Sequence, residues 1–254
     1  MDIVKHNKSA WDNYVDKKDR WTIPATGKEL EEARNGNWGI VLTPNKKVPK
    51  DWFPQLKGLK ILGLASGGGQ QGPILATLGA DVTIFDNSEK QLEQDNILSN
   101  KHNLKIKTVQ GDMKDLSVFE DNSFDLIFNP CSIVFVDDVR PVWKECYRVL
   151  KPGGVLMTGL INPIIFQLDD ESLQLIYKQP FSDIHSLPKE KLKKLKEENE
   201  PLVFGHSLSD QIGGQLDAGF TITTMFEDTW DVENIMNDFM PSFIATRAIK
   251  QKVK

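Results

Sequence analysis

Short apolar runs alternate with amphipathic stretches through the middle of the chain. An apolar run of about four to eight residues is typical of a buried strand, and apolar residues three and four apart are typical of a helix. This pattern predicts strands at Lys60–Leu64, Asp81–Phe85, Ile106–Val109, Phe124–Phe128 and Val155–Thr158. Because helical stretches separate them, we expect right-handed crossovers and a parallel, doubly wound α/β sheet.

The helices predicted between these strands carry recognisable start and stop signals. Pro73 is tolerated in the first turn of a helix predicted at Pro73–Leu78. Ser88 begins the next helix, and Gln91 three residues on completes a capping box. A further helix is predicted at Val139–Leu150, because the Lys-Pro-Gly-Gly sequence that follows it is a strong stop signal.

Two last strands are predicted near the end of the chain. Ser207 can cap a helix that runs through Ala218 and ends at Gly219. Strands at Thr221–Phe226 and Phe243–Ile249 follow, joined by a loop of about a dozen residues with no helical pattern. Strands joined in this way pair antiparallel. The whole pattern therefore predicts a seven-stranded sheet whose last strand is antiparallel.

Two segments fall outside the strand–helix pattern. Residues 1–58 are polar with scattered aromatic residues, and short helices are predicted there from Ser9 through Val15 and at Glu29–Arg34. We interpret this segment as an N-terminal cap on a domain of residues 59–254. Residues 162–204 interrupt that domain and contain a charged stretch, Lys189–Glu200, that is typical of a solvated surface helix. We interpret the insertion as a lid.

Composition and charge narrow the class of protein. The 254 residues are 39% hydrophobic and 26% charged, and the formal net charge is −5. An acidic chain argues against nucleic acid as the main partner, because such partners favour a basic surface. No apolar signal core or bilayer-spanning run is visible, so we expect a cytoplasmic protein without a membrane partner. Two cysteines and four scattered histidines show no metal-ligand spacing, and the oligomeric state stays open.

The most specific motif is a glycine-rich loop between the first two predicted strands. Three consecutive glycines, Gly67–Gly69, follow Ala65 and Ser66. Glycine lets the backbone turn sharply and approach a ligand where a Cβ would collide. Asp86 ends the second strand about twenty residues after the loop, where an acid can accept hydrogen bonds from a ribose diol. The pattern predicts a site for an adenosine-type cofactor.

Other residues at the predicted carboxyl edge of the sheet bear on which cofactor binds. Ala65 replaces the first glycine of G-x-G-x-x-G, which argues against a nicotinamide cofactor, and no P-loop pattern is present. Asp112 follows the third strand and can accept from an adenine amine, while Met113 offers an apolar edge. Asn129 and Pro130 follow the fourth strand, and we interpret Asn129 as a cofactor-side or structural residue.

From Lys60 to Gly159 the chain resembles the class I S-adenosylmethionine-dependent methyltransferases, of the type 11-like bacterial branch. The resemblance rests on the glycine loop, the acid at Asp86, the Gly-Asp-Met sequence at 111–113 and the block VWKECYRVLKPGGVLMTG. It implies a Rossmann-like fold and S-adenosyl-L-methionine as the cofactor. The cofactor-binding residues that it implies are Ala65, Ser66, Gly67, Gly69, Gln70, Gln71, Asp86, Asn87, Gln91, Asp112, Met113, Asn129 and Pro130.

The chain departs from that family just before the glycine loop. The acid expected two residues before the first glycine position is Gly63 here. In the family this acid helps to hold the amino-acid end of the cofactor. We expect Ser66, Gln70, Asn129 or the N-terminal cap to take over that role. Gln71 fits a cofactor contact and a first-turn surface residue equally well.

The resemblance implies in-line methyl transfer to a small soluble acceptor. The sulfonium is already a strong electrophile, so alignment of the acceptor can suffice without a dedicated catalytic residue. Asp137, Asp138 and His185 are weak candidates for a base, and the two aspartates suit a helix N-cap better.

The N-terminal cap and the insertion, acting as a substrate lid, are expected to form the acceptor site. Apolar walls are expected from Phe166, Tyr177 and Phe181 of the insertion, and Cys131 is interpreted as a small, half-buried wall. Trp11, Tyr14 and Trp21 of the cap suit packing better than the pocket mouth. The sequence leaves two other functions open, an NAD(P)-dependent oxidoreductase and a non-catalytic S-adenosylmethionine-binding protein.

Overall fold

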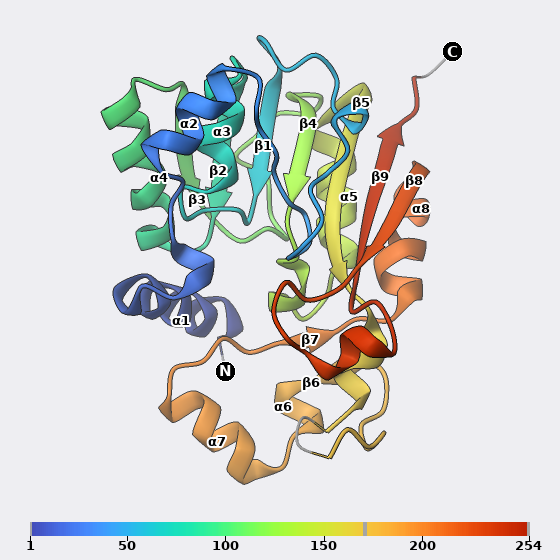
Figure 1. Ribbon diagram of the computed structural model, residues 1–254. Helices are drawn as coiled ribbons and strands as arrows, with labels where there is room; N and C mark the ends of the chain where they lie inside the picture. The colour runs from blue at the N-terminus through green and yellow to red at the C-terminus, as the bar shows by residue number, and fades with distance from the viewer. Residues whose placement is uncertain (1, 170–171, 253–254) are drawn as a thin grey trace.

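The structure, a computed structural model, describes residues 2–169 and 172–252. Its centre is a sheet of seven strands in the order β3-β2-β1-β4-β5-β9-β8 (Figure 1). The strands are β1 Lys60–Leu64, β2 Asp81–Asp86, β3 Ile106–Gln110, β4 Phe124–Asn129, β5 Leu150–Ile161, β8 Phe220–Asp228 and β9 Phe243–Lys250. Strands β1 to β5 run parallel, and β9 pairs antiparallel with both β5 and β8. The predicted sheet with an antiparallel last strand is confirmed.

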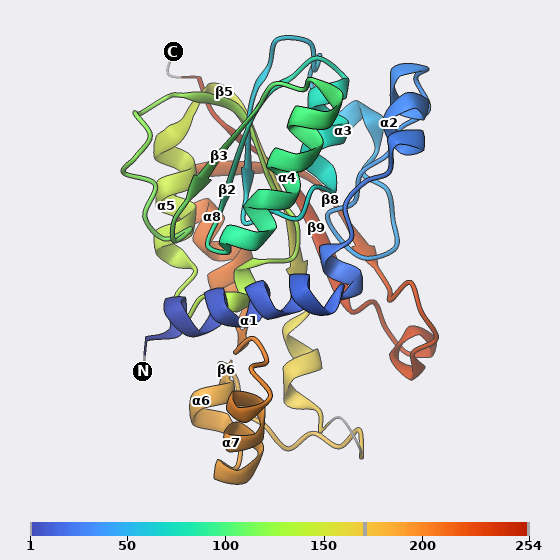
Figure 2. The ribbon, with the colours of Figure 1, turned by 90° about the vertical axis from the view of Figure 1, so that its left-hand side faces the viewer.

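Helices cover both faces of this sheet (Figure 2). The helices of one face are α3 Gln71–Thr77 and α4 Glu89–His102, and those of the other are α5 Arg140–Val149 and α8 Gly214–Asp217. Successive strand residues point to opposite faces. Ile61 therefore lies in the same buried cluster as Leu75 of α3, whereas its neighbour Leu62 lies in the cluster that contains Val142 of α5. Both faces of the parallel strands are buried, as their apolar sequences indicate.

The first helix of the N-terminal segment crosses the edge of the sheet where the parallel strands end, and the second lies beside α3 (Figures 1 and 2). The segment contains α1 Ile3–Lys17 and α2 Gly27–Arg34. The expectation that Ser9 begins the first helix is wrong, because Asp2 is the N-cap and accepts a hydrogen bond from the Lys5 N–H at 3.0 Å. Ser9 lies inside the helix. The helix predicted at Glu29–Arg34 is confirmed and begins two residues earlier.

The insertion lies beyond the carboxyl ends of the parallel strands (Figure 1). Its elements are the 3-10 helix Pro163–Gln167, β6 Phe181–Ser182, α6 Asp183–Ser186, α7 Lys189–Glu197 and β7 Phe204–Gly205. β6 and β7 form a separate two-stranded sheet. α7 has no buried residue, so the predicted surface helix is confirmed, although it ends three residues early. No described helix has the length and apolarity needed to cross a bilayer.

The helix expected between Ser207 and Ala218 is less regular than its pattern suggests. Residues Ser209–Gly213 form a π-helical turn, and α8 continues only from Gly214 to Asp217. Gly219 adopts φ +105° and ends the helix as expected. The remaining short helices are Arg20–Thr22, Lys50–Trp52, Ile133–Phe135 and Ile235–Asp238.

Candidate active site

A cavity of about 340 Å³ opens at the carboxyl edge of the sheet. The chain runs from β1 outward to β2 and β3 and then returns to β4 on the other side of β1, so the strand order reverses at this place. Ligands of doubly wound sheets bind at such a reversal. Eleven of the thirteen residues predicted for the cofactor line the cavity, namely Ala65, Ser66, Gly67, Gln70, Gln71, Asp86, Asn87, Gln91, Asp112, Met113 and Pro130. Gly69 and Asn129 do not line it.

The glycine loop is shaped by close approach of the backbone to its neighbours. A Cβ on Gly67 would lie 2.8 Å from the Gln91 Cβ and 3.1 Å from the Asp86 Cγ. Gly69 has φ +70°, a conformation that L side chains rarely adopt. The conformation of the loop therefore requires both glycines. Gly69 does not line the cavity, but it allows the loop to adopt the shape that lines it.

Asp86 connects the end of β2 to the glycine loop. One carboxylate oxygen, Oδ2, accepts from the Gly67 N–H at 2.9 Å, and the other, Oδ1, accepts from the Ser88 N–H at 2.9 Å. Burial raises the pKa of Asp86, while these hydrogen bonds act against the rise. Each carboxylate oxygen can accept more than one hydrogen bond, so the side chain keeps acceptor capacity toward the cavity. The predicted contact with a ribose stays a prediction.

A second acid, Asp95 of α4, holds the other two glycines. Its side chain is completely buried, and Oδ2 accepts from the N–H groups of Gly68 and Gly69 at 3.0 and 3.1 Å. Oδ1 has no hydrogen-bond partner among the described residues. Burial raises the pKa of Asp95 to about 7. This role was not predicted, although Asp95 follows Gln91 by four residues and therefore faces the same side of the helix.

Asn129 joins three strands instead of facing the cavity. Its Nδ2 donates to the Leu64 carbonyl at 2.8 Å and to the Ser132 Oγ at 2.6 Å. Its Oδ1 accepts from the Thr158 Oγ at 2.8 Å. Since the side chain is fully buried and its amide is engaged on both atoms, the structural interpretation of Asn129 is favoured over the cofactor contact.

The missing acid at position 63 has a steric explanation. A Cβ on Gly63 would lie 2.5 Å from the Ser66 Oγ and 2.6 Å from the Ile84 Cδ1, so no larger side chain fits there without a rearrangement. The Ser66 Oγ is buried and finds no hydrogen-bond partner within the described part of the chain. The Gln91 Oε1 is also buried without a hydrogen-bond partner among the described residues. The capping box predicted with Ser88 is therefore only half formed, because the Ser88 Oγ accepts from the Gln91 N–H but the Gln91 side chain does not bind back.

The two glutamines after the loop bind the N-terminal segment. Gln70 donates from Nε2 to the Trp21 carbonyl at 2.8 Å, and the Gln71 Oε1 accepts from the Val41 N–H at 3.4 Å. Both residues line the cavity as well. They therefore connect the cap to the rim of the glycine loop.

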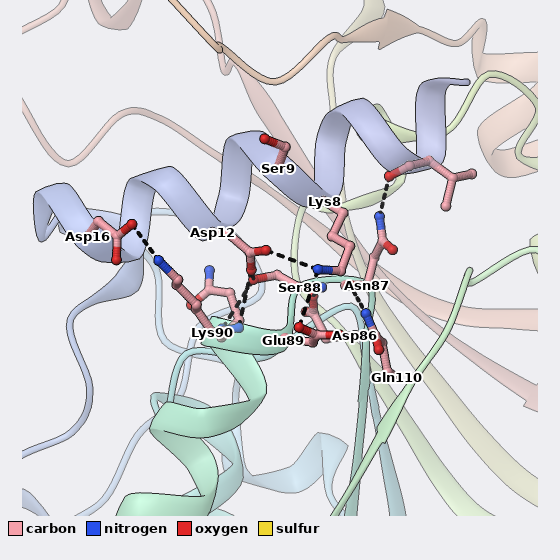
Figure 3. Close-up of polar contacts among 12 residues, drawn as sticks. Lys8, Ser9, Asp12, Asp16, Asp86, Asn87, Ser88, Glu89, Lys90 and Gln110 are labelled. Atoms are coloured by element: carbon pink, nitrogen blue, oxygen red, sulfur yellow. Dashed lines mark hydrogen bonds and ion pairs between the residues drawn. The ribbon is translucent and has the colours of Figure 1, made fainter. Parts of the chain in front are cut away.

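Helix α1 covers the turn between β2 and α4 (Figure 3). The Asp12 Oδ1 accepts from the Ser88 Oγ at 2.6 Å and from the Lys90 N–H at 3.2 Å. Asn87 donates from Nδ2 to the Val4 carbonyl at 2.7 Å. These contacts place the first helix of the chain directly beside Asp86 and bring Trp11 into the cavity wall.

The remaining predicted residues divide between the cavity and its surroundings. Trp11, Trp21, Cys131 and Phe166 line the cavity. Tyr14 instead donates a hydrogen bond to Glu200, and Tyr177 packs edge-on against Phe181 outside the lining. The three candidate bases, Asp137, Asp138 and His185, also lie outside it.

The two aspartates have structural partners of their own. The Asp137 carboxylate pairs with Lys114 at 2.6 Å, which lowers the pKa of the acid. Asp138 accepts from the Arg140 N–H at 3.0 Å in the first turn of α5. The expectation that one of the two aspartates is the N-cap of this helix is wrong, because Val139 is the N-cap and Asp138 precedes it.

Comparison with known proteins identifies the family of the chain. A family profile described as a methyltransferase domain matches residues 62–158. A Bacillus subtilis (strain 168) protein described as "Uncharacterized methyltransferase YbaJ" is 51% identical over 253 residues, which cover 98% of each chain. The chain belongs to the methyltransferase family. The methyltransferase class predicted from the sequence is confirmed.

More distant proteins resemble this methyltransferase in part of its sequence or in its fold. The sterol 24-C-methyltransferase erg6 of Aspergillus fumigatus is 35% identical over 102 residues, which cover 39% of the chain and 27% of that protein. An S-adenosylmethionine-dependent methyltransferase from Mesorhizobium loti superposes with a TM-score of 0.58 at 19% identity, over 79% and 94% of the two chains. An arsenic(III) S-adenosylmethionine methyltransferase from Chlamydomonas reinhardtii superposes with a TM-score of 0.53 at 22% identity. The superposition covers 91% of this chain and 74% of that protein. The two structures establish the shared fold.

Proposed function

We propose that the cavity binds S-adenosyl-L-methionine and that a small-molecule acceptor receives the methyl group there. When bound, this cofactor supplies an electrophilic methyl carbon. The observation that carries the proposal is that Ser66, Asp86, Gln91 and Asp112, all predicted for the cofactor, line one cavity at the reversal of the strand order. The Ser66 Oγ and the Gln91 Oε1 are also buried without a partner among the described residues, whereas buried polar atoms of native proteins are normally hydrogen-bonded.

Each part of the cofactor has suitable residues in this proposal. Asp86 would accept from the ribose hydroxyls, because both of its oxygens retain acceptor capacity after binding the backbone. Asp112 and Met113 would flank the adenine. The methionine end would lie near the Ser66 hydroxyl and the amide groups of Gln70 and Gln71. No residue here needs to transfer a proton for the methyl group to move, because alignment of the acceptor supplies most of the acceleration.

Residues 1–58 and 162–204 have separate roles in this proposal. The first segment acts as the cap beside the ribose site, since α1 contacts the β2–α4 turn through Asp12 and Asn87. The insertion acts as a substrate lid on a catalytic domain of residues 59–254, and it contributes Phe166 and Val203 to the cavity wall. We place the reaction in the cytoplasm. Membership in the methyltransferase family disfavours the NAD(P)-dependent and the non-catalytic alternatives.

Replacement of Ser66 separates a ligand contact from a structural role. Ser66→Ala is expected to leave the free energy of unfolding unchanged or to raise it by about 1 kcal/mol, because a buried hydroxyl without a hydrogen bond is removed. The same change is expected to weaken S-adenosylhomocysteine binding about tenfold, or ~1.4 kcal/mol. Urea denaturation and calorimetric titration measure the two effects. Ser117→Ala, an exposed serine outside the cavity, is the control that should change neither. Unchanged affinity in Ser66→Ala would contradict the proposal.

A further inference from the structure

The cavity has two unlike halves, which lie at different strands along the carboxyl edge of the sheet. The half above β1, β2 and β3 carries Ser66, Asp86 and Asp112, which the proposed function assigns to the cofactor. The other half lies at the ends of β4 and β5 and beside β9. Its wall is apolar, and we name it the acceptor half, built mainly from Leu42, Phe135, Ile161, Phe166, Trp230 and Phe243.

The few polar side chains of the acceptor half are engaged with the protein itself. The Thr43 Oγ1 donates to the Asp228 carboxylate at 2.7 Å, and the Ser132 Oγ accepts from Asn129 at 2.6 Å. Asn7 donates from Nδ2 to the carbonyls of Phe135 and Leu202, and its Oδ1 accepts from the Leu202 N–H. An acceptor molecule therefore meets apolar surface over most of this wall, and apolar surface favours an apolar ligand.

No described residue of the acceptor half can serve as a general base. The half contains no Asp, Glu, His, Lys or Tyr among the described lining residues, and the cavity carboxylates Asp86 and Asp112 belong to the cofactor half. The remaining titratable group is the Cys131 thiol, whose pKa burial raises, so it stays protonated. A general base must lie within hydrogen-bond reach of the proton that it removes.

We infer, on the basis of the proposed function, that the acceptor is a largely apolar thiol that ionises without help from the protein. A thiol has a pKa near about 8.5 and is partly thiolate at neutral pH, whereas an aliphatic alcohol needs a base and an aliphatic amine, with a pKa near about 10.4, is almost wholly protonated and has no free electron pair. The thiol proton passes to solvent. The thiolate sulfur then forms a bond to the methyl carbon, the carbon–sulfonium bond breaks with its electron pair moving to the cofactor sulfur, and the products are a methyl thioether and S-adenosylhomocysteine.

Three acceptors of one shape test this inference. Benzyl mercaptan, benzylamine and benzyl alcohol differ only in the nucleophilic atom. With S-adenosylmethionine and the full-length protein, methyl transfer to the mercaptan is expected at least 100-fold faster than to the alcohol. In a series of ring-substituted benzenethiols, the pH at which kcat/KM levels off is expected to follow the pKa of each thiol. Equal rates with the alcohol, or one fixed pH profile for every thiol, would reveal a base on the protein and overturn the inference.

One pair of variants tests the location of the acceptor. Phe166→Ala is expected to raise KM for benzyl mercaptan about tenfold and to leave the S-adenosylhomocysteine Kd unchanged. Phe239→Ala, at a side chain 78% exposed and outside the cavity, is the matched control and should change neither value. Normal S-adenosylhomocysteine binding without methylation of any thiol overturns the thiol inference alone. Absence of S-adenosylhomocysteine binding overturns the proposed function as well.

Discussion

Asp86→Ala is expected to weaken binding of S-adenosylhomocysteine about 100-fold, or ~2.7 kcal/mol. The change removes the carboxylate that is proposed to accept from the ribose hydroxyls, and hydrogen bonds to a charged acceptor are stronger than neutral ones. It also removes the acceptor of the Gly67 and Ser88 N–H groups, so the loop beside the ligand loses its support. Calorimetric titration of both proteins measures the effect. Asp81→Ala, at the exposed start of the same strand, is the control and should bind normally.

A ligand variant separates the ribose contact from support of the loop. S-adenosylhomocysteine without its ribose 2′-hydroxyl should bind the unaltered protein more weakly than the complete ligand. In Asp86→Ala the two ligands should bind alike, because the group that distinguishes them is gone. If removal of the hydroxyl cost the same affinity in both proteins, Asp86 would not contact the ribose.

Asp95→Leu is expected to lower the free energy of unfolding by about 3 kcal/mol and the melting temperature by about 10 °C. Leucine has a similar shape but leaves the N–H groups of Gly68 and Gly69 without their acceptor in a buried place. Asp95→Asn keeps one acceptor oxygen and should preserve stability and ligand affinity. Thermal denaturation at pH 5.5 compares the three proteins. Equal melting temperatures for the leucine and asparagine variants would contradict the role of Asp95 in holding the loop.

The stability of the unaltered protein is expected to depend on pH more strongly than that of Asp95→Asn. Burial raises the pKa of Asp95 to about 7, whereas in the unfolded chain an aspartate has a pKa near about 3.9. Between these values the folded protein holds a proton that the unfolded chain has released, so its unfolding free energy falls as the pH rises. Relative to Asp95→Asn, the unaltered protein should lose about 3 kcal/mol between pH 5 and pH 8. Urea denaturation across this range measures the difference, and parallel curves would mean that Asp95 is charged throughout.

The sheet and most of the cavity could be predicted because their signals are local. Apolar runs, a glycine loop and an acid at the end of a strand each occupy a few consecutive residues, and a doubly wound sheet brings strand ends to one edge. Ala65, Asp86 and Met113 therefore meet at one cavity, as expected. The surface helix α7 could also be predicted, since Leu192 and Leu195 are the only apolar residues in its charged sequence and neither is buried.

The role of Asn129, which the sequence left open, and that of Asp95, which was not predicted, depend on distant contacts. Asn129 occupies a strand end that commonly faces the ligand, but the Leu64 carbonyl and the Thr158 hydroxyl bind its amide. Asp95 looks like any polar residue of a helix until the glycine N–H groups are placed against it. The start of α1 was missed because a capping signal at Asp2 was overlooked in favour of Ser9. Tertiary partners decided the first two cases, and local sequence alone does not contain them.

Titration of S-adenosylhomocysteine into the unaltered protein, followed by calorimetry, tests the proposed cofactor site most directly. One molecule is expected to bind per chain, with a dissociation constant on the order of micromolar. NADH in the same experiment is expected to give no binding heat. Saturable binding of NADH together with a flat titration for S-adenosylhomocysteine would contradict the proposed site.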